Sequence, residues 1–377
     1  MSGGGGNDQF AWLGLLKWSL AYTDGTENVT PGEISAEDRA FLEKVMSEGI
    51  VDEGVIMRRT LLHLVKALQD FLGVGAETAG DESAKLLAAI SAHQAQSSAS
   101  SSSNPAEPDL GELLDELDEL RDIVEQIDFA RSFVNMNALP FLLGAASSGL
   151  LVPERLRASC LSVIATLAQN NPDVQDVAKE SLAVAKLSET FASSSDGGDA
   201  YKAKILQALS AVVRGHDPNS ADFFANDQAV AIVKDGIVSG GTVCRRAVFL
   251  ARALLTDDNS TPERVAAFAD VMETVVELAG SSEEIDVRET CIGLLNGVLT
   301  KGGESAKTVY PYAEKIKNFC QTVVEKWKGE ANEEEKGYLA EDMAQWLALM
   351  KLLKQAVNGG GGSVMSKTAE AAPLMLK

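Results

Sequence analysis

Basic side chains gather in four helical segments of an otherwise acidic chain. The segments, residues 157–169, 202–214, 244–256 and 288–300, together hold eight basic residues but one acid, Glu289. The average composition of the chain would place about seven or eight acids among these 52 residues. Clustered positive charge steers and holds acidic partners, so the chemistry available to these residues is electrostatic binding. The eight are Arg157, Lys202, Lys204, Arg214, Arg245, Arg246, Arg252 and Arg288.

Residue types used in catalysis or metal binding are few and scattered. His63, His93 and His216 are the only histidines, and none lies near a cysteine or an acid at metal-ligand spacing. No GxSxG, HExxH or paired-cysteine motif occurs. Residues 302–308 are similar to a phosphate-binding loop, but Ala306 replaces the glycine before the lysine, so a turn between helices is the simpler interpretation. We expect no enzyme activity, no cofactor and no metal site.

Cysteine usage and charge limit the compartment and the partners. The four cysteines lie inside apolar helical patterns without CxxC spacing, which favours a reducing compartment. The net charge of −22 repels phosphate backbones and anionic membranes. No secretory signal and no run of 18 apolar residues is found. We expect a monomer of the cytosol, with the nucleus as a second location, that binds neither nucleic acid nor membranes.

The four basic segments also form a structural repeat. Their starts are 45, 42 and 44 residues apart, and an apolar helical stretch precedes each of them, at 138–149, 181–192, 228–239 and 265–279. A period of about 40–47 residues is typical of armadillo and HEAT units, which stack to bury a continuous core. We therefore predict an all-α protein, an armadillo/HEAT-like α-solenoid of four to five repeats with a small N-terminal helical module and a C-terminal helical cap.

Changes in composition mark the remaining boundaries. A serine-rich stretch and a glycine-rich stretch are each too polar or flexible to pack, and they read as a linker and a tail. Helical patterns at 306–327 and 333–357 form the expected cap, and an acidic amphipathic helix at 110–128 opens the repeats. The predicted parts are a flexible N-terminal segment with an apolar-aromatic helix (1–34), a helical module (35–91), a Ser-rich linker (92–109), the repeats (110–302), the cap (303–357) and a disordered tail (358–377).

Three separately placed motifs resemble a known family, the armadillo-type nucleotide-exchange factors of the heat shock 70 kDa protein chaperone (the cytosolic Fes-type or heat-shock-70-binding-protein family). Residues 15–26 resemble the family's N-terminal LKWSL-x-Y-x-DGT motif and are followed by Ser-Ala-Glu-Asp-Arg-Ala-Phe-Leu at 35–42. Residues 113–117 and 125–130 resemble the family's LLDEL...ESIDMA stretch. Residues 169–172 read Gln-Asn-Asn-Pro, as in the family. The similarity covers roughly 10–45 and 110–300.

The resemblance implies a non-enzymatic co-chaperone in protein folding and the stress response. It would bind the ATPase domain of a heat shock 70 kDa chaperone through the concave face of its repeats and promote ADP release. The last helix of each armadillo unit lines that face, so basic residues there would meet an acidic partner. The residues expected to bind the partner are Arg157, Gln169, Asn170, Asn171, Lys202, Lys204, Arg245, Arg246, Phe249, Arg252 and Asn296.

Other interpretations remain open for several of these residues. The basic side chains can be solvated charges at helix starts, although cations there oppose the helix dipole. Residues 169–171 can simply end a helix before Pro172, and Asn296 can be a buried polar residue. Phe249, with the leucines around it, can belong to the solenoid core. In function, the alternative is a general armadillo adaptor or transport scaffold that binds a peptide in its groove, although basic helices disfavour basic cargo.

An apolar-aromatic segment lies outside the repeats. Trp12, Leu15, Leu16 and Trp18 form an apolar face that no repeat requires. This face either docks on the body of the protein or, as the family resemblance suggests, mimics a hydrophobic client of the chaperone and helps to release it. The Ser-rich linker separates the segment from the repeats.

Deletion of residues 1–30 distinguishes these two roles. We expect the shortened protein to keep its melting temperature and its ADP-release activity, because the repeats form a separate core. Release of a persistent client from the chaperone should become slower. Thermal denaturation and a client-release assay measure both properties. A loss of several degrees in melting temperature would show instead that the segment packs on the solenoid.

Overall fold

The structure is a computed structural model, and its described residues form helices and the turns between them. The chain divides into two compact units, Met1–Arg59 and Thr60–Lys377, and helix α3 (Glu53–Leu72) crosses this division. The second unit carries all of the basic segments. The residues whose structure is described are 52–72, 110–194, 198–330 and 332–359.

Helices of the second unit follow one another in groups of three. After an opening helix, α5 (Gly111–Ile123), the described residues repeat the order of first, second and third helix five times. The first helices are α6 (Ile127–Asn135), α9 (Pro172–Glu180), α12 (Asp217–Ala225), α15 (Pro262–Ala266) and α18 (Gly303–Lys307). The second helices are α7 (Ala138–Ser147), α10 (Ala183–Ser193), α13 (Asp227–Ser239), α16 (Met272–Ser281) and α19 (Ala313–Gly329). The third helices are α8 (Glu154–Ala168), α11 (Asp199–Val213), α14 (Gly241–Thr256), α17 (Ile285–Lys301) and α20 (Glu333–Gly359).

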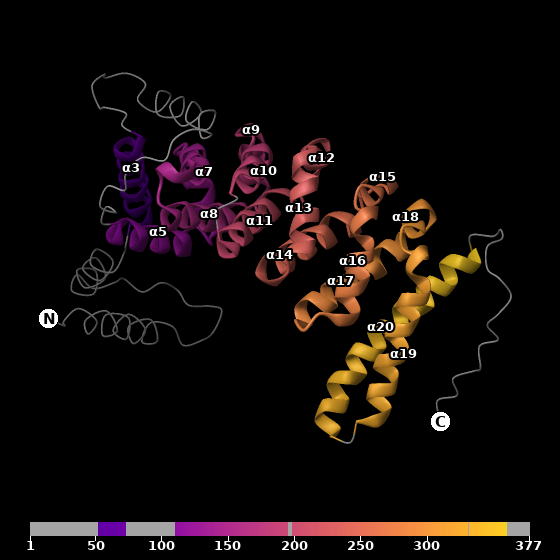
Figure 1. Ribbon diagram of the computed structural model, residues 1–377. Helices are drawn as coiled ribbons and strands as arrows, with labels where there is room; N and C mark the ends of the chain where they lie inside the picture. Colours follow the sequence, from indigo (N-terminus) through magenta and orange to yellow (C-terminus); the bar gives the residue numbers. More distant parts are fainter. Residues whose placement is uncertain (1–51, 73–109, 195–197, 331, 360–377) are drawn as a thin grey trace, which may run out of the picture. The chain divides into compact units, whose positions relative to one another are not determined.

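Helices of the same rank pack against one another. The opening helix α5 contacts α8, and the third helices then continue pairwise from α8 through α11, α14 and α17 to α20 (Figure 1). The second helices make a parallel series from α7 to α19. This arrangement is the predicted all-α solenoid, in which each unit completes the core of its neighbour.

Apolar residues of the third helices form the centre of this core. Leu161, Ile164, Leu206 and Leu209 are fully buried, as the repeat pattern predicts. Phe249 is the exception, because 41% of it is exposed. The alternative interpretation of this ring as a core residue is therefore wrong. Among the described residues, none of the helices is both long and apolar enough to span a membrane.

Two of the predicted helices are each interrupted by a 3-10 turn. The stretch predicted over 265–279 is divided into α15, a 3-10 turn (η2, Ala269–Val271) and α16. The helix predicted over 306–327 is likewise divided by the 3-10 turn η3 (Tyr310–Tyr312), which contains Pro311. Proline lacks the amide proton that a helix interior needs, so it ends the preceding turn. With these breaks, α18, α19 and α20 repeat the order of the preceding units.

The turns between repeats are built in the same way at two places. Asn170 follows α8 with a φ of 54°, and Gly215 follows α11 with a φ of 70°. Asparagine and glycine are the residues that most readily adopt this left-handed conformation, which reverses the chain after a helix. Pro172 and Pro218 then lie in the first turn of the next helix, where no amide partner is lost.

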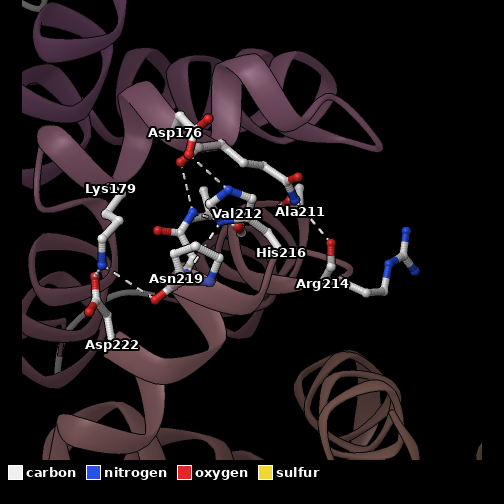
Figure 2. A network of polar contacts seen from close by, with 10 residues as sticks. Asp176, Lys179, Ala211, Val212, Arg214, His216, Asn219 and Asp222 are labelled. Atoms are coloured by element: carbon white, nitrogen blue, oxygen red, sulfur yellow. Dashed lines mark hydrogen bonds and ion pairs between the residues drawn. The ribbon is translucent and has the colours of Figure 1, made fainter. Parts of the chain in front are cut away.

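Buried amides hold the end of α11 to α9 of the same repeat and to α12 of the next repeat. The Gln175 side chain on α9 donates to the carbonyl oxygens of Ala211 and Arg214, at 2.8 and 3.0 Å (Figure 2). The Asn219 side chain on α12 donates to the carbonyl oxygens of Gln175 and Val212, at 2.8 and 3.0 Å. These bonds satisfy carbonyl groups in the last turn of α11 that the helix itself leaves free. They thereby fix α9 and α12 against the end of a third helix.

Two polar side-chain pairs surround these amides. The Nε2 atom of His216 lies 3.1 Å from Oδ1 of Asp176, and Nζ of Lys179 lies 2.6 Å from Oδ2 of Asp222 (Figure 2). Each pair joins α9 to the start or the body of α12. The spacing between successive repeats therefore depends on polar contacts as well as on apolar packing.

Replacement of Gln175 by alanine tests this dependence. Gln175→Ala leaves the carbonyl groups of Ala211 and Arg214 without their donor, and we expect the free energy of unfolding to fall by about 1–3 kcal/mol. Equilibrium unfolding in urea measures the change. Gln228→Ala on α13 is the matched control, since its side chain is exposed. Equal stability of the two variants would contradict the structural role of Gln175.

Candidate partner-binding face

Because neighbouring third helices pack on both sides of one another, each leaves a single stripe of residues open to solvent. We call the combined stripes of α8, α11, α14 and α17 the third-helix face. Side-chain contacts run across it from one helix to the next, as the following paragraphs describe. Its members are Ser159, Ser162, Lys204, Gln207, Arg214, Arg246, Phe249, Arg252, Gly293 and Asn296.

Lys204 occupies the middle of this face. Its Nζ atom donates to Oγ of Ser162 on α8 at a distance of 2.6 Å. Partial burial lowers the pKa of Lys204, and the positive charges of Arg121 and Arg246 lower it further, whereas Asp118 opposes the shift. The side chain therefore lies in a region where positive charge is not fully compensated.

Phe249 and its neighbours form the second feature of the face. The guanidinium of Arg214 on α11 lies over the Phe249 ring, 5.1 Å from its centroid. Arg252, one turn further along α14, lies against α17 at Gly293, where an added Cβ atom would be 2.7 Å from Cζ of Arg252. A guanidinium above an aromatic ring is favourable by about 0.5–1 kcal/mol at an exposed site. One arginine thus covers the exposed ring, and a second lies one turn further along α14, against α17.

These cations differ from several others in the part of the chain that the structure describes. No ion pair joins Lys204, Arg214, Arg246 or Arg252 to a carboxylate within the described residues, whereas Arg131, Lys179, Lys234 and Lys315 each lie beside one. A protein with a net charge of −22 has ample acid with which to neutralise them. The unpaired positive charge on α11 and α14 is complementary to an acidic partner.

Three predicted partner-binding residues pack against other parts of the solenoid. Arg157 is only 8% exposed, and its guanidinium lies 4.6 Å from the centroid of the Tyr201 ring. Asn171 is 1% exposed at the start of α9. Lys202 lies over the ring of Phe191, 5.8 Å from its centroid. Because they pack within the solenoid, Arg157 and Asn171 are not part of the third-helix face.

Arg245 is exposed but already paired. Its Nε atom donates to Oε2 of Glu284 at 3.0 Å, and Asp286 lies close to the same guanidinium. These carboxylates raise the pKa of Arg245. The charge of Arg245 is therefore matched by the next repeat, unlike that of its neighbour Arg246.

The remaining predicted residues lie at the edges of the face. Gln169 and Asn170 are exposed after the last turn of α8. Asn296 is half-buried on α17, and its Oδ1 atom has no hydrogen-bond donor in the described structure. The predicted client-mimicking residues Trp12, Leu15, Leu16 and Trp18 lie outside the described residues.

Titratable residues elsewhere take part in packing. His63 lies 3.1 Å from Glu116, as His216 does from Asp176. Burial raises the pKa of the Cys160 thiol to about 12, and it also raises that of Cys291, so these thiols are protonated and unreactive at neutral pH. In the part of the chain that the structure describes, no three of its His, Cys, Asp and Glu residues are grouped as metal ligands.

Arg214 and Gly293 are among the residues of the face that were not predicted as site residues. Arg214 was counted among the basic residues, but its place over Phe249 depends on the packing of α11 against α14. Gly293 and Gly297 lie one turn apart on α17, where they contact Arg252 and Thr256. Glycine costs about 1 kcal/mol relative to alanine inside a helix, so two glycines at this spacing were the available signal of close contact.

Comparison with known proteins gives one short sequence match and several structural ones. No family model matches the chain. The Hsp70 nucleotide exchange factor FES1 of Scheffersomyces stipitis is 31% identical over 105 residues, which are 28% of this chain and 36% of that protein. The chain thus spans about a third of the length of this relative.

The structural matches show the fold. An engineered protein of the Northeast Structural Genomics Consortium has a TM-score of 0.53 at 13% identity, covering 67% of this chain and 94% of its own. A second has a TM-score of 0.52 at 12% identity, covering 78% and 68%. A designed armadillo repeat protein in complex with the peptide (KR)4 has a TM-score of 0.50 at 16% identity, covering 65% and 95%. The second unit is an α-solenoid of the armadillo kind.

Lys204→Met tests whether burial of the Lys204 ammonium group, together with the neighbouring positive charges, destabilises the fold. The pKa of Lys204 is lower in the folded protein than in the unfolded chain, so its charged form destabilises the fold below that pKa, and the penalty disappears as pH rises toward the ordinary lysine value. We expect the variant to have a higher melting temperature at pH 7 and a smaller gain at pH 10.

Lys234→Met is the control for this measurement. Nζ of Lys234 lies 2.8 Å from Asp270, so its replacement should not raise the melting temperature. A lower melting temperature for Lys204→Met at pH 7 would show that the bond to Ser162 outweighs the repulsion.

Proposed function

We propose that this protein is a nucleotide-exchange factor that binds the ATPase domain of a heat shock 70 kDa chaperone through the third-helix face and promotes ADP release. The observation that carries the proposal is the group of unpaired cations on α11 and α14 in a strongly acidic protein. The match to an Hsp70 nucleotide exchange factor supports the choice of partner. The protein acts in this proposal as a cytosolic, monomeric co-chaperone without enzyme activity.

Exchange requires binding that depends on the state of the chaperone. A ligand that binds two conformations equally cannot change their populations. Two arrangements of the ATPase domain matter here, one that holds ADP weakly and one that holds it well. The third-helix face must therefore bind the first arrangement more tightly than the second. By linkage, ADP must then weaken the binding of the exchange factor by the same factor.

The alternative is a general armadillo adaptor that holds a peptide on the same face. One observation favours peptide binding, since a designed armadillo neighbour is in complex with a peptide, (KR)4. The third-helix face is itself positively charged, so its charge does not favour a basic peptide. Lys204, Arg246 and Arg252 would repel a basic peptide, so a cargo in this alternative would have to be acidic.

Arg246→Glu tests the proposal in an exchange assay. The chaperone is loaded with a fluorescent ADP analogue, and its release is followed after the protein is added. We expect the wild type to accelerate release and the variant to act at least about tenfold more weakly at equal concentration, because a like charge then faces an acidic surface. Circular dichroism and melting should be unchanged, since exposed charges alter stability by about 0.5 kcal/mol or less.

Lys328→Glu is the matched control, since it makes the same change of charge at an exposed position on α19, away from the face. It should retain wild-type exchange. Absence of any acceleration by the wild type would overturn the proposed function. Equal activity of Arg246→Glu and wild type at physiological salt would show that the face does not bind the chaperone.

A further inference from the structure

One part of the third-helix face has the geometry of a defined binding subsite. It consists of Arg214, Phe249 and Arg252, with Gly293 beneath Arg252, and we call it the α14 anchor. Arg214 covers one side of the Phe249 ring, while 41% of that residue remains open to solvent. An aromatic residue and arginines at the centre of a surface are the types that contribute most to protein–protein binding.

Gly293 sets the position of Arg252. An added Cβ atom at this residue would lie 2.7 Å from Cζ, 2.9 Å from Nε and 3.0 Å from Nη1 of Arg252. Any side chain at residue 293 must therefore push the guanidinium away from α17. The displaced group is the flexible end of an arginine, so the helices themselves need not move.

The charges around the α14 anchor are one-sided. Neither Arg214 nor Arg252 has a carboxylate partner in the described structure. The nearest acid along α17, Glu289, is one turn before Gly293 and forms no ion pair with Arg252. A guanidinium binds a carboxylate with two parallel hydrogen bonds, and the open side of the Phe249 ring offers contact to an apolar side chain.

We propose that the α14 anchor binds an acidic segment of the partner protein in which a carboxylate lies beside an apolar side chain, with Gly293 as the residue that positions Arg252. The carboxylate contacts Arg252, and the apolar side chain packs on Phe249. The inference rests on the proposed function in that it takes the third-helix face as the partner-binding surface, and it specifies the chemistry that this surface recognises.

A peptide-binding measurement tests the inference without the chaperone. The probe is a short fluorescein-labelled peptide of glutamate and leucine, and its anisotropy is followed as the full chain is added at low salt. We expect Arg252→Gln and Gly293→Ala each to weaken binding at least about fivefold, since each removes the guanidinium from its position. Arg245→Gln is the matched control on the same helix, and its affinity should stay within about twofold because Arg245 is paired with Glu284.

The double variant distinguishes positioning from direct contact. If Gly293 acts only through Arg252, the combination of Gly293→Ala and Arg252→Gln should bind no more weakly than Arg252→Gln alone. Full additivity of the two changes would overturn the positioning role. Circular dichroism and thermal melting of each variant confirm that the fold is retained.

Three results would overturn the α14 anchor as an acidic subsite. These are no binding of the glutamate–leucine peptide by the wild type, equal binding by Arg252→Gln, and equal binding of a lysine–leucine peptide. Failure of the exchange assay with intact peptide selectivity would instead refute only the proposed function, so the two failures are distinguishable.

Discussion

Lateral packing of the third helices is the constraint on which the rest of the structure depends. Each of α11, α14 and α17 packs between two other third helices, and α8 packs between α5 and α11, so much of the surface of each helix is covered. Burial of Leu161, Ile164, Leu206 and Leu209 fixes the rotation of these helices. The polar residues between the buried ones are thereby brought into one surface, although they lie about 40–47 residues apart in the chain.

Whether a cation on that surface is neutralised depends on the acidic residues that the neighbouring repeats place beside it. Glu284 of the next repeat pairs with Arg245, so the charge of Arg245 is neutralised. This ion pair also joins the two repeats. Within the described residues, no ion pair joins Lys204, Arg246 or Arg252 to a carboxylate, and Asp118 offsets only part of the positive charge around Lys204. The described structure therefore carries unpaired cations on one face of an acidic protein, which would favour an acidic partner at that face.

The repeat, the third helices and much of their buried face could be predicted from the sequence, because apolar periodicity and a regular period are local signals. The roles of individual cations could not. Arg157 and Arg246 occur in similar sequence contexts, but one stacks on Tyr201 while the other is exposed. Contacts between helices that are distant in the sequence decide this difference. Such contacts also determine the roles of Gln175 and Gly293. The break in the predicted helix at Pro311 could not be predicted either, because the apolar pattern continues across it.

Site-specific photocrosslinking tests most directly whether the third-helix face is the partner-binding surface. A photoreactive amino acid is placed at Gln207, in the middle of the face on α11, or at Gln228, exposed on α13, and each protein is irradiated with the ATPase domain of a heat shock 70 kDa chaperone in its ADP state. The account predicts a covalent complex from residue 207 and little or none from residue 228. A complex formed only from residue 228 would contradict it.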